Sequence, residues 1–278
     1  MKRRAPAKLN LTLRIHGKRE DGFHELETLM VPLPGLADTL ELERAEFFSL
    51  EVQGAEVGPV EENLVTRALR LFEEHTGRAC PYRITLEKGV PAGAGLGGGS
   101  SDAAAMLRAL NELEGTGLTA SELESLGAQL GSDVPFFLRE GPCWCRGRGE
   151  ILEDADAEGF HVLLLKPAFG VNTVDAYRHW AGAEELPDVH YEPQRLGEVE
   201  LYNGLERPVF AKFLFLAELK MWLLHQEEVR AALMSGSGAT VFAVVREAAA
   251  TESLAERARK ELDPNLWWWG GSTKAVLD

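Results

Sequence analysis

The chain has 278 residues, of which 45% are hydrophobic and 26% charged, and its net charge is −15. This length suits one large or two ordinary domains with a full core, and the composition is typical of a globular protein. An acidic chain repels nucleic acid and anionic membranes, so we expect neither as a partner. A small phosphorylated substrate is still allowed, because it meets local charge and any bound metal.

Cysteine usage and the first residues predict the cellular compartment. Cys80, Cys143 and Cys145 are odd in number and lack the spacing of metal ligands, which favours free thiols in a reducing cytosol. The basic residues 1–4 are not followed by the apolar stretch of a signal peptide, and no run reaches the length of a membrane span. We therefore expect a cytoplasmic protein.

The first elements are expected to be strands. Apolar and polar residues alternate over 8–15, which predicts a strand with Lys8, Asn10 and Thr12 on one face. This segment alone favours a solvated role for that face. Residues 21–22 indicate a turn, and Phe23-His24 opens the next extended segment.

Further strands and one helix are expected before residue 80. Leucine and valine positions over 40–42 and 50–52 indicate more strand. Asn63 is the expected N-cap of a helix that Gly77 ends.

A glycine-rich loop over 91–99 joins an alternating strand, 82–87, to a helix with one apolar face. Ser100, Ser101 and Asp102 offer N-cap chemistry at the start of this helix. Bare N–H groups and the helix dipole make such a place an anion site, usually for phosphate. Glycines allow close approach of the amides and positive φ. The competing interpretation is a plain linker or a tight helix–strand contact.

Three familiar motifs do not fit this loop. Gly93 and Gly98 have Walker A spacing, but Gly99 stands where the phosphate-binding lysine belongs. The dinucleotide pattern at Gly93, Gly95 and Gly98 requires a second strand ending in an acidic residue about 20 positions later, where we expect a helix end and a turn. The nucleophile elbow fails because the second residue after Ser100 is not glycine. A phosphate loop of another kind remains.

The region after this helix contains a second ambiguous residue. A capping box over 119–122 opens a helix that Gly131 ends. Asp133 follows, with Pro135 in the first turn of another helix, and either an N-cap or a catalytic carboxylate fits Asp133. Glycines at 147 and 149 and an acidic run over 153–158 indicate a domain boundary, which we set between residues 155 and 156.

The rest of the chain predicts a second unit of strands and helices. We expect a buried strand over 162–165, Thr173 as the cap of a short helix, and a long helix after Asn203 that breaks near Pro208. A second glycine loop, 234–239, leads into a strand over 240–245, and a helix then passes through 254–262. The three tryptophans of a last strand, 266–269, are expected to serve core and edge packing.

Three separated segments, 5–10, 91–105 and 235–239, resemble the superfamily of galactokinase, homoserine kinase, mevalonate kinase and phosphomevalonate kinase, the GHMP kinases. Segments 21–26, 95–104, 131–136, 147–150 and 203–206 resemble one family within it, the 4-diphosphocytidyl-2-C-methyl-D-erythritol kinases. The chain departs from the usual pattern of this family at three positions, with Phe23 in place of tyrosine, Ser132 in place of alanine and Gly204 in place of aspartate or serine.

The resemblance implies an α/β (α+β) fold of two domains. Residues 1–155 would form an ATP-binding N-terminal domain like ribosomal protein S5 domain 2, and residues 156–278 a ferredoxin-like, substrate-binding C-terminal domain. The implied reaction is ATP-dependent phosphorylation of the 2-hydroxyl of the cytidine diphosphate-linked methylerythritol in the non-mevalonate isoprenoid pathway. The implied assembly is a monomer or a weak homodimer.

The same resemblance assigns the candidate site. Asp133 would take the proton of the acceptor hydroxyl, and Lys8 would hold Asp133 ionised and stabilise the transferred phosphoryl group. ATP would be bound by Asn63, Leu64, Pro91, Gly93, Gly95, Leu96, Gly97, Gly98, Gly99, Ser100 and Ser101, with Ser100 or Ser101 near Mg²⁺. The acceptor would be bound by Asn10, Phe23, His24, Thr173, Tyr177, Gly236, Ser237 and Gly238, with Phe23, His24 and Tyr177 on the cytosine.

Two other functions compete with this one. Another kinase of the superfamily, acting on homoserine or mevalonate, would have no nucleobase for the segment 23–26 to bind. A catalytically inactive nucleotide sensor on the same fold would have no need to retain Lys8 and Asp133.

Overall fold

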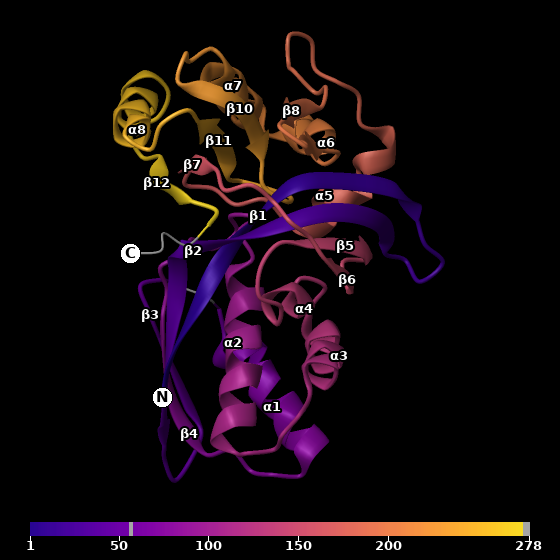
Figure 1. Ribbon diagram of the computed structural model, residues 1–278, viewed down its shortest axis with the longest axis vertical. Helices are drawn as coiled ribbons and strands as arrows, with labels where there is room; N and C mark the ends of the chain where they lie inside the picture. Colours follow the sequence, from indigo (N-terminus) through magenta and orange to yellow (C-terminus); the bar gives the residue numbers. More distant parts are fainter. Residues whose placement is uncertain (56–57, 275–278) are drawn as a thin grey trace.

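The computed structural model describes residues 1–55 and 58–274, which form two stacked parts joined by a long hairpin (Figure 1). The strands are β1 (Lys2–Lys18), β2 (His24–Arg44), β3 (Ser49–Gln53), β4 (Tyr82–Glu87), β5 (Cys143–Gly147), β6 (Ile151–Asp154), β7 (His161–Lys166), β8 (Gln194–Leu196), β9 (Val199–Asn203), β10 (Val229–Met234), β11 (Val241–Val245) and β12 (Trp267–Ser272). The α-helices are α1 (Leu64–Thr76), α2 (Gly98–Leu113), α3 (Ala120–Leu130), α4 (Val134–Phe137), α5 (Thr173–Arg178), α6 (Glu206–Lys212), α7 (Leu214–Leu224) and α8 (Ala250–Glu261), with 3₁₀ turns at Val60–Glu62 and Trp180–Gly182.

The lower part in Figure 1 is a mixed sheet covered by helices α1 to α4. Its strand order is β3-β4-β2-β1-β9-β8, and β5 and β6 extend from β2. Apolar positions of β2 and β4, including Leu40, Leu42 and Ile84, pack against Phe72 of α1 and Leu107 of α2. The alternation read from the sequence therefore has a physical cause, since one face of these strands is core.

The upper part is an antiparallel sheet in the order β10-β11-β7-β12, with helices α6 and α7 between β7 and β10 and helix α8 between β11 and β12. This βαββαβ arrangement with a split strand order is the ferredoxin-like pattern. Trp267 and Trp269 pack on one core and Trp268 on another, so the three tryptophans serve packing as predicted. Within the described residues, no helix is long and apolar enough to cross a bilayer.

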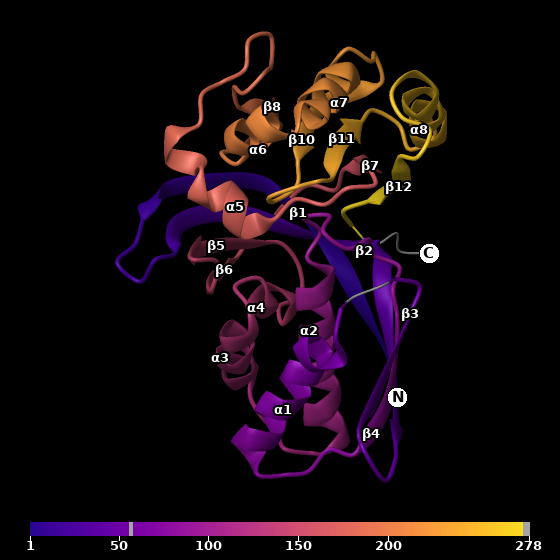
Figure 2. The same cartoon turned by 180° about the vertical axis from the view of Figure 1, so that it is seen from behind.

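The two parts are not separated at a single point of the chain. Strand β9 pairs in parallel with β1 at Thr12 and Leu13, so residues after 156 complete the sheet of the first part. Leu9 and Leu11 of β1 also share one core with Leu164 and Phe242 of the upper sheet. Figure 2 shows the β1–β2 hairpin passing between the two parts from behind. The division at 155/156 stays a prediction.

Several local predictions are confirmed. The Asn63 side chain accepts the N–H of Val65 at 2.9 Å, and Gly77 ends α1 with a φ of 68°. The capping box at the start of α3 is complete, since Thr119 and Glu122 each bond the other's backbone N–H. These features depend on a few neighbouring residues, which is why they can be read without tertiary information.

Other local predictions are wrong. Helix α2 begins at Gly98 with Gly97 as its N-cap, so the serines that follow lie inside the helix rather than capping it. Asn172 instead of Thr173 caps α5, because its side chain accepts the N–H of Asp175 at 3.0 Å. The long helix breaks at Phe213, whereas Pro208 sits in the first turn of α6, where a missing N–H leaves no bond unmade.

Candidate active site

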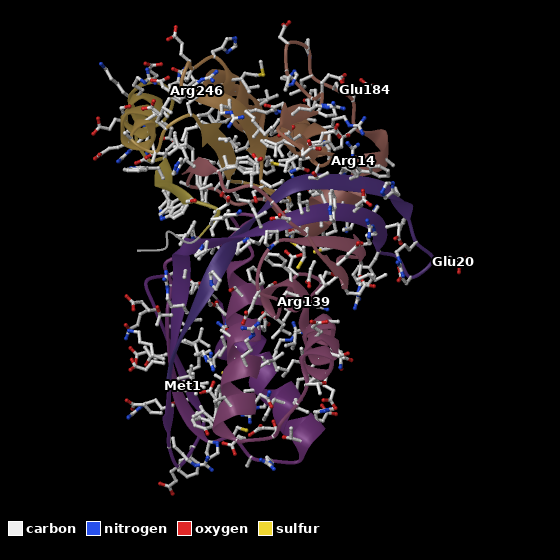
Figure 3. The ribbon with its side chains drawn as sticks, viewed as in Figure 1. Met1, Arg14, Glu20, Arg139, Glu184 and Arg246 are labelled. Carbon is white, nitrogen blue, oxygen red and sulfur yellow. The ribbon has the colours of Figure 1, made fainter. Side chains whose placement is uncertain are left out.

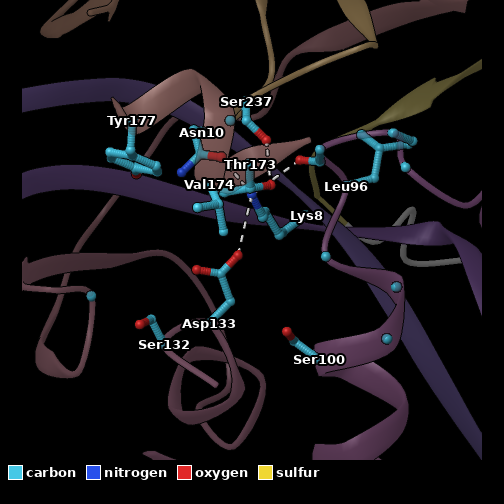
Figure 4. Close-up of a pocket in the computed structure, with 18 of the residues that line it drawn as sticks. Lys8, Asn10, Leu96, Ser100, Ser132, Asp133, Thr173, Val174, Tyr177 and Ser237 are labelled. Carbon is cyan, nitrogen blue, oxygen red and sulfur yellow. Dashed lines mark hydrogen bonds and ion pairs between the residues drawn. The ribbon is translucent and has the colours of Figure 1, made fainter. Parts of the chain in front are cut away.

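A cavity of about 1110 Å³ lies where the two parts of the molecule meet. Its walls come from β1, β2, the glycine loop before α2, the start of α4, the helix α5 and the second glycine loop (Figure 4). The predicted site residues that line it are Lys8, Asn10, Phe23, His24, Asn63, Leu64, Pro91, Gly93, Gly95, Leu96, Gly97, Gly98, Gly99, Ser100, Asp133, Thr173, Tyr177, Gly236 and Ser237. Ser101 is buried away from this surface, and Gly238 packs against Met234, so these two predictions do not fit the cavity wall.

Lys8 and Asp133 face each other across the cavity (Figure 4). The distance from Lys8 Nζ to Asp133 Oδ2 is 3.6 Å, and Nζ also donates to the carbonyl of Gly95 at 3.0 Å and to Asn10 Oδ1. Asp133 precedes α4, but its side chain makes no cap hydrogen bond within the described residues and is 37% exposed. Its carboxylate is therefore available to a ligand, which favours the catalytic over the capping interpretation.

The polar face of β1 is buried, so its solvated interpretation is wrong. Lys8, Asn10 and Thr12 are each almost fully covered, because the second part of the molecule lies over them. Asn10 Nδ2 donates to Thr28 Oγ1 at 2.8 Å, and that hydroxyl donates to the carbonyl of Thr12 at 2.6 Å. This chain of bonds orients the amide so that Oδ1 faces Lys8.

The first glycine loop needs glycine at three positions for backbone reasons. Gly93, Gly95 and Gly97 have φ of 60°, 72° and 73°, a region that favours glycine. A Cβ on Gly95 would lie 2.1 Å from the carbonyl oxygen of Ser235. Gly98 lies at the start of α2 without a positive φ, so positive φ is not the reason for a glycine there.

The two glycine loops are in direct contact. Carbonyls of residues 93, 94 and 95 accept hydrogen bonds from the N–H of Ala239 at 3.2 Å, the N–H of Thr240 at 3.2 Å and Oγ of Ser235 at 3.1 Å. In a trans peptide the N–H opposes the C=O, so the N–H groups of residues 94–96 point away from the second loop and can serve an anion.

Aromatic rings gather at one end of the cavity. The ring centroids of His24 and Tyr177 are 5.3 Å apart, and Trp180 meets His24 edge-on at 6.1 Å. Phe23 is 48% exposed, and the Cζ of Arg148 lies 4.9 Å from its ring centroid. Flat rings with open faces can stack on a planar base.

The imidazole of His24 is suited to pair with the edge of a base. Burial, with a smaller contribution from the charge of Lys18, lowers the pKa of His24 below its usual value. The ring is therefore neutral near pH 7 and has one donor and one acceptor nitrogen.

An ion cluster next to the first glycine loop was missed from the sequence. Lys88 bridges Asp38 and Asp102, at 2.6 Å from Asp102 Oδ2, and all three side chains are buried. Asp38 also accepts the N–H groups of Gly89 and Val90, both at 2.7 Å. The cluster thus joins β2, the entrance of the glycine loop and the first part of α2. No local sequence pattern predicts this cluster, because Asp38 lies far from Lys88 and Asp102 in the chain.

Asp102 is the unusual member of this cluster. Burial raises its pKa to about 7, and the nearby charge of Lys88 opposes this rise only in part. Its Oδ1 has no hydrogen-bond partner in the part of the chain that the structure describes. Asp102 is therefore a member of a buried ion cluster inside α2 and not the helix cap that the sequence indicated.

The residues present fit a magnesium ion only if phosphate oxygens supply most of its ligands. Residues 1–55 and 58–274 contain no cluster of three or more His, Cys, Asp or Glu side chains that could hold a metal. Ser100 lines the cavity, whereas Ser101 does not, so the geometry favours Ser100 of the two candidates. Magnesium commonly binds through one or two protein ligands plus substrate phosphates and water.

Comparisons with known proteins agree with this geometry. The family described as GHMP kinases N terminal domain matches residues 63–141, and the one described as GHMP kinases C terminal matches residues 192–264. The 4-diphosphocytidyl-2-C-methyl-D-erythritol kinase of Methylacidiphilum infernorum is 41% identical, with 95% of this chain and 93% of that protein covered. The enzyme of the same name from Desulfitobacterium hafniense is also 41% identical, with the same coverage.

Solved structures give the same relationship in three dimensions. A crystal structure of 4-(cytidine 5'-diphospho)-2C-methyl-D-erythritol kinase matches with a TM-score of 0.79 and 38% identity, over 98% of both chains. A homoserine kinase from Cytophaga hutchinsonii matches with a TM-score of 0.69 over 99% of this chain and 94% of that one, but at 17% identity it shows only the shared fold. The fold is thus the two-domain α/β fold of GHMP kinases, and the chain belongs to the 4-diphosphocytidyl-2-C-methyl-D-erythritol kinase family.

Proposed function

We propose that this protein transfers a phosphoryl group from ATP to the 2-hydroxyl of 4-diphosphocytidyl-2-C-methyl-D-erythritol, a step of the non-mevalonate isoprenoid pathway. The observation that carries the proposal is the Lys8–Asp133 pair, which stands in one cavity between a glycine loop suited to phosphates and an aromatic end suited to a base. The family relationship supports the same substrate.

The reacting groups act mainly by position and charge. Asp133 accepts the proton of the attacking hydroxyl, and Lys8 lies 3.6 Å from this carboxylate and faces the transferred phosphoryl group. Asn10, held by Thr28, orients the hydroxyl. Phosphoryl transfer needs little else from a protein beyond positioning and electrostatic stabilisation.

ATP occupies the loop side of the cavity. Its phosphates lie along residues 93–99 and the start of α2, and its adenine lies near Asn63 and Leu64. Mg²⁺ beside Ser100 would offset the charge on the phosphates when bound. In this proposal the N-terminal domain binds ATP and the C-terminal domain contributes to the acceptor site.

The acceptor occupies the aromatic side of the cavity. Phe23 and Tyr177 stack on the cytosine, and the neutral imidazole of His24 bonds its edge. Thr173 and Ser237, whose hydroxyls are 2.7 Å apart, close the cavity over the acceptor phosphates.

The test is an assay of ADP release with MgATP and a panel of acceptors. We expect turnover with the CDP-linked methylerythritol and none with homoserine, mevalonate or the UDP-linked analogue. Turnover with homoserine or mevalonate alone would refute the proposed substrate, and ATP binding without transfer to any acceptor would favour a nucleotide sensor.

We further propose that the protein is cytoplasmic and is a monomer or a weak homodimer. Sedimentation velocity measures the state of assembly.

A further inference from the structure

A buried polar cluster lies behind the second glycine loop and outside the cavity wall. It consists of Asn203 at the end of β9, Glu206 at the start of α6 and Lys220 in α7. Lys220 is 0% exposed and Glu206 is 1% exposed. Burial of an unpaired charge is costly, so a cluster of this kind is tolerated only when its groups are well paired.

Asn203 holds the loop by two bonds. Its Nδ2 donates to the carbonyl of Met234 and to the carbonyl of Gly236, both at 2.7 Å. Its Oδ1 accepts the N–H of Leu205 at 2.9 Å, which fixes the orientation of the amide. The Asn203 side chain thus bonds both ends of the segment 234–236 to the end of β9.

Glu206 fastens the same segment from a second side. Its Oε1 accepts the N–H of Met234 at 2.9 Å, and its Oε2 accepts a hydrogen bond from Lys220 Nζ at 2.6 Å. Lys220 also donates to the carbonyl of His190. Met234 therefore has its N–H held by Glu206 and its C=O held by Asn203.

The loop passes this constraint to the reacting residues. Ser235 bonds the carbonyl of Gly95, the same carbonyl that Lys8 bonds. A Cβ placed on Gly236 would lie 3.1 Å from Asn10 Oδ1 and 3.4 Å from Lys8 Nζ. Because these groups are in close contact, a shift of the second glycine loop would also displace Lys8, Asn10 and the first glycine loop.

We propose that Asn203 and the Glu206–Lys220 pair are positioning residues, which hold the second glycine loop and through it orient Lys8 and the first glycine loop. Neither lines the cavity. The kinetic consequences rest on the proposed function, whereas the effect on loop geometry does not.

The test uses Asn203→Asp in the full chain, with Gln194→Glu as the matched control. Asn203→Asp keeps the acceptor for Leu205, removes the donor to the loop and places a carboxylate oxygen against the two carbonyls. Gln194→Glu makes the same amide-to-carboxylate change on the neighbouring strand β8, where Gln194 donates to the carbonyl of Ala232 and accepts its N–H, away from the loop. Asn203→Ala is a second variant that introduces no buried charge.

Amide hydrogen exchange of the ligand-free protein is the first measurement. We expect exchange in peptides covering 234–239 and 93–97 to rise about tenfold in Asn203→Asp and Asn203→Ala, since each lost bond changes a local opening equilibrium by about this order. The control should leave both peptides unchanged. Unchanged exchange in both loops of either Asn203 variant would overturn the proposal.

Kinetics is the second measurement and separates positioning from a general loss of stability. We expect kcat to fall about tenfold and KM for ATP to rise about tenfold in Asn203→Asp, with the control close to the unaltered protein. Equal kinetic losses in Asn203→Asp and in Gln194→Glu would overturn the proposal. If the unaltered protein turned over no acceptor, the proposed function would fail, while the exchange measurement would still decide the positioning role.

Discussion

Replacing Gly95 by alanine tests whether the two glycine loops must touch. A Cβ at this position would lie 2.1 Å from the carbonyl oxygen of Ser235 and 2.9 Å from that of Gly238, and real Cβ contacts stay above 3.0 Å. The loops must therefore separate by roughly 1 Å. The backbone φ of 72° adds a second penalty, because a side chain disfavours this region by about 1–2 kcal/mol.

The new side chain also disturbs the bonds at the Gly95 carbonyl, because the backbone that carries this oxygen must move. This oxygen accepts from Lys8 Nζ at 3.0 Å and from Ser235 Oγ at 3.1 Å. A charged donor contributes about 1.5–3 kcal/mol and a neutral one about 1 kcal/mol, so the total loss is about 4 kcal/mol. Since 1.4 kcal/mol is about tenfold, we expect kcat/KM to fall by at least about 10²-fold and Tm to fall by roughly 10 °C.

Gly77→Ala is the matched control, because Gly77 has a similar φ of 68° with no atom within 4 Å of the added Cβ and lies outside the cavity. It should lose only the conformational part, about 1–2 kcal/mol, with unchanged kinetics. Activity is measured by ADP release and stability by thermal unfolding. Equal changes in the Gly95 and Gly77 variants would refute the argument from loop contact.

Three further predictions concern single side chains. Asp133→Asn should retain ATP binding and lose turnover by about 10²–10⁴-fold in the ADP-release assay, whereas a lowered Tm with normal turnover would make it a helix cap. Tyr177→Ala should raise KM for the CDP-linked acceptor by about ten- to a hundredfold. His24→Ala should relax discrimination against the UDP-linked acceptor. A defect in ATP binding in either variant would contradict the prediction for that residue. Because burial raises the pKa of Asp102 above its value in the unfolded chain, its stabilising contribution is present below about pH 4 and lost as pH rises through about 7. Urea unfolding from pH 5 to 8 should therefore show Asp102→Asn gaining stability relative to the unaltered protein, by at most about 3 kcal/mol, and a constant difference would contradict this sign.

Figure 3 illustrates why charge alone says little about the site. Labelled charged residues such as Glu20 and Glu184 lie toward the outside of the molecule, far apart from one another. The net charge of −15 describes such surface groups, whereas the charged residues that line the cavity are mostly basic: Lys8, Lys18, Lys88, Arg148 and Arg178, against Glu62, Asp102 and Asp133. A phosphorylated ligand meets this local set, so an acidic protein can still bind it.

Features that depend on neighbours along the chain could be predicted without the structure. The cap at Asn63, the stop at Gly77 and the capping box at Thr119 follow from side chains within a few residues. The glycine loop after an alternating strand also indicated a phosphate site without structural help. Motif order then identified the GHMP superfamily, because its three segments are each short and local.

The roles of the polar residues depend on how distant elements pack together. Lys8 and Asn10 read as a solvated face until the second part of the molecule covered them. Asp102 and Thr173 read as caps, but Asp102 accepts a hydrogen bond from Lys88, and the hydroxyl of Thr173 is bonded to that of Ser237. These partners lie on other elements of the fold, whereas periodicity along the chain indicates only whether a residue faces core or surface. The contact between the two glycine loops could not be predicted for the same reason, because its bonds join residues more than a hundred positions apart. The buried cluster of Asn203, Glu206 and Lys220 could not be predicted either, because its members lie on separate elements that only packing brings together.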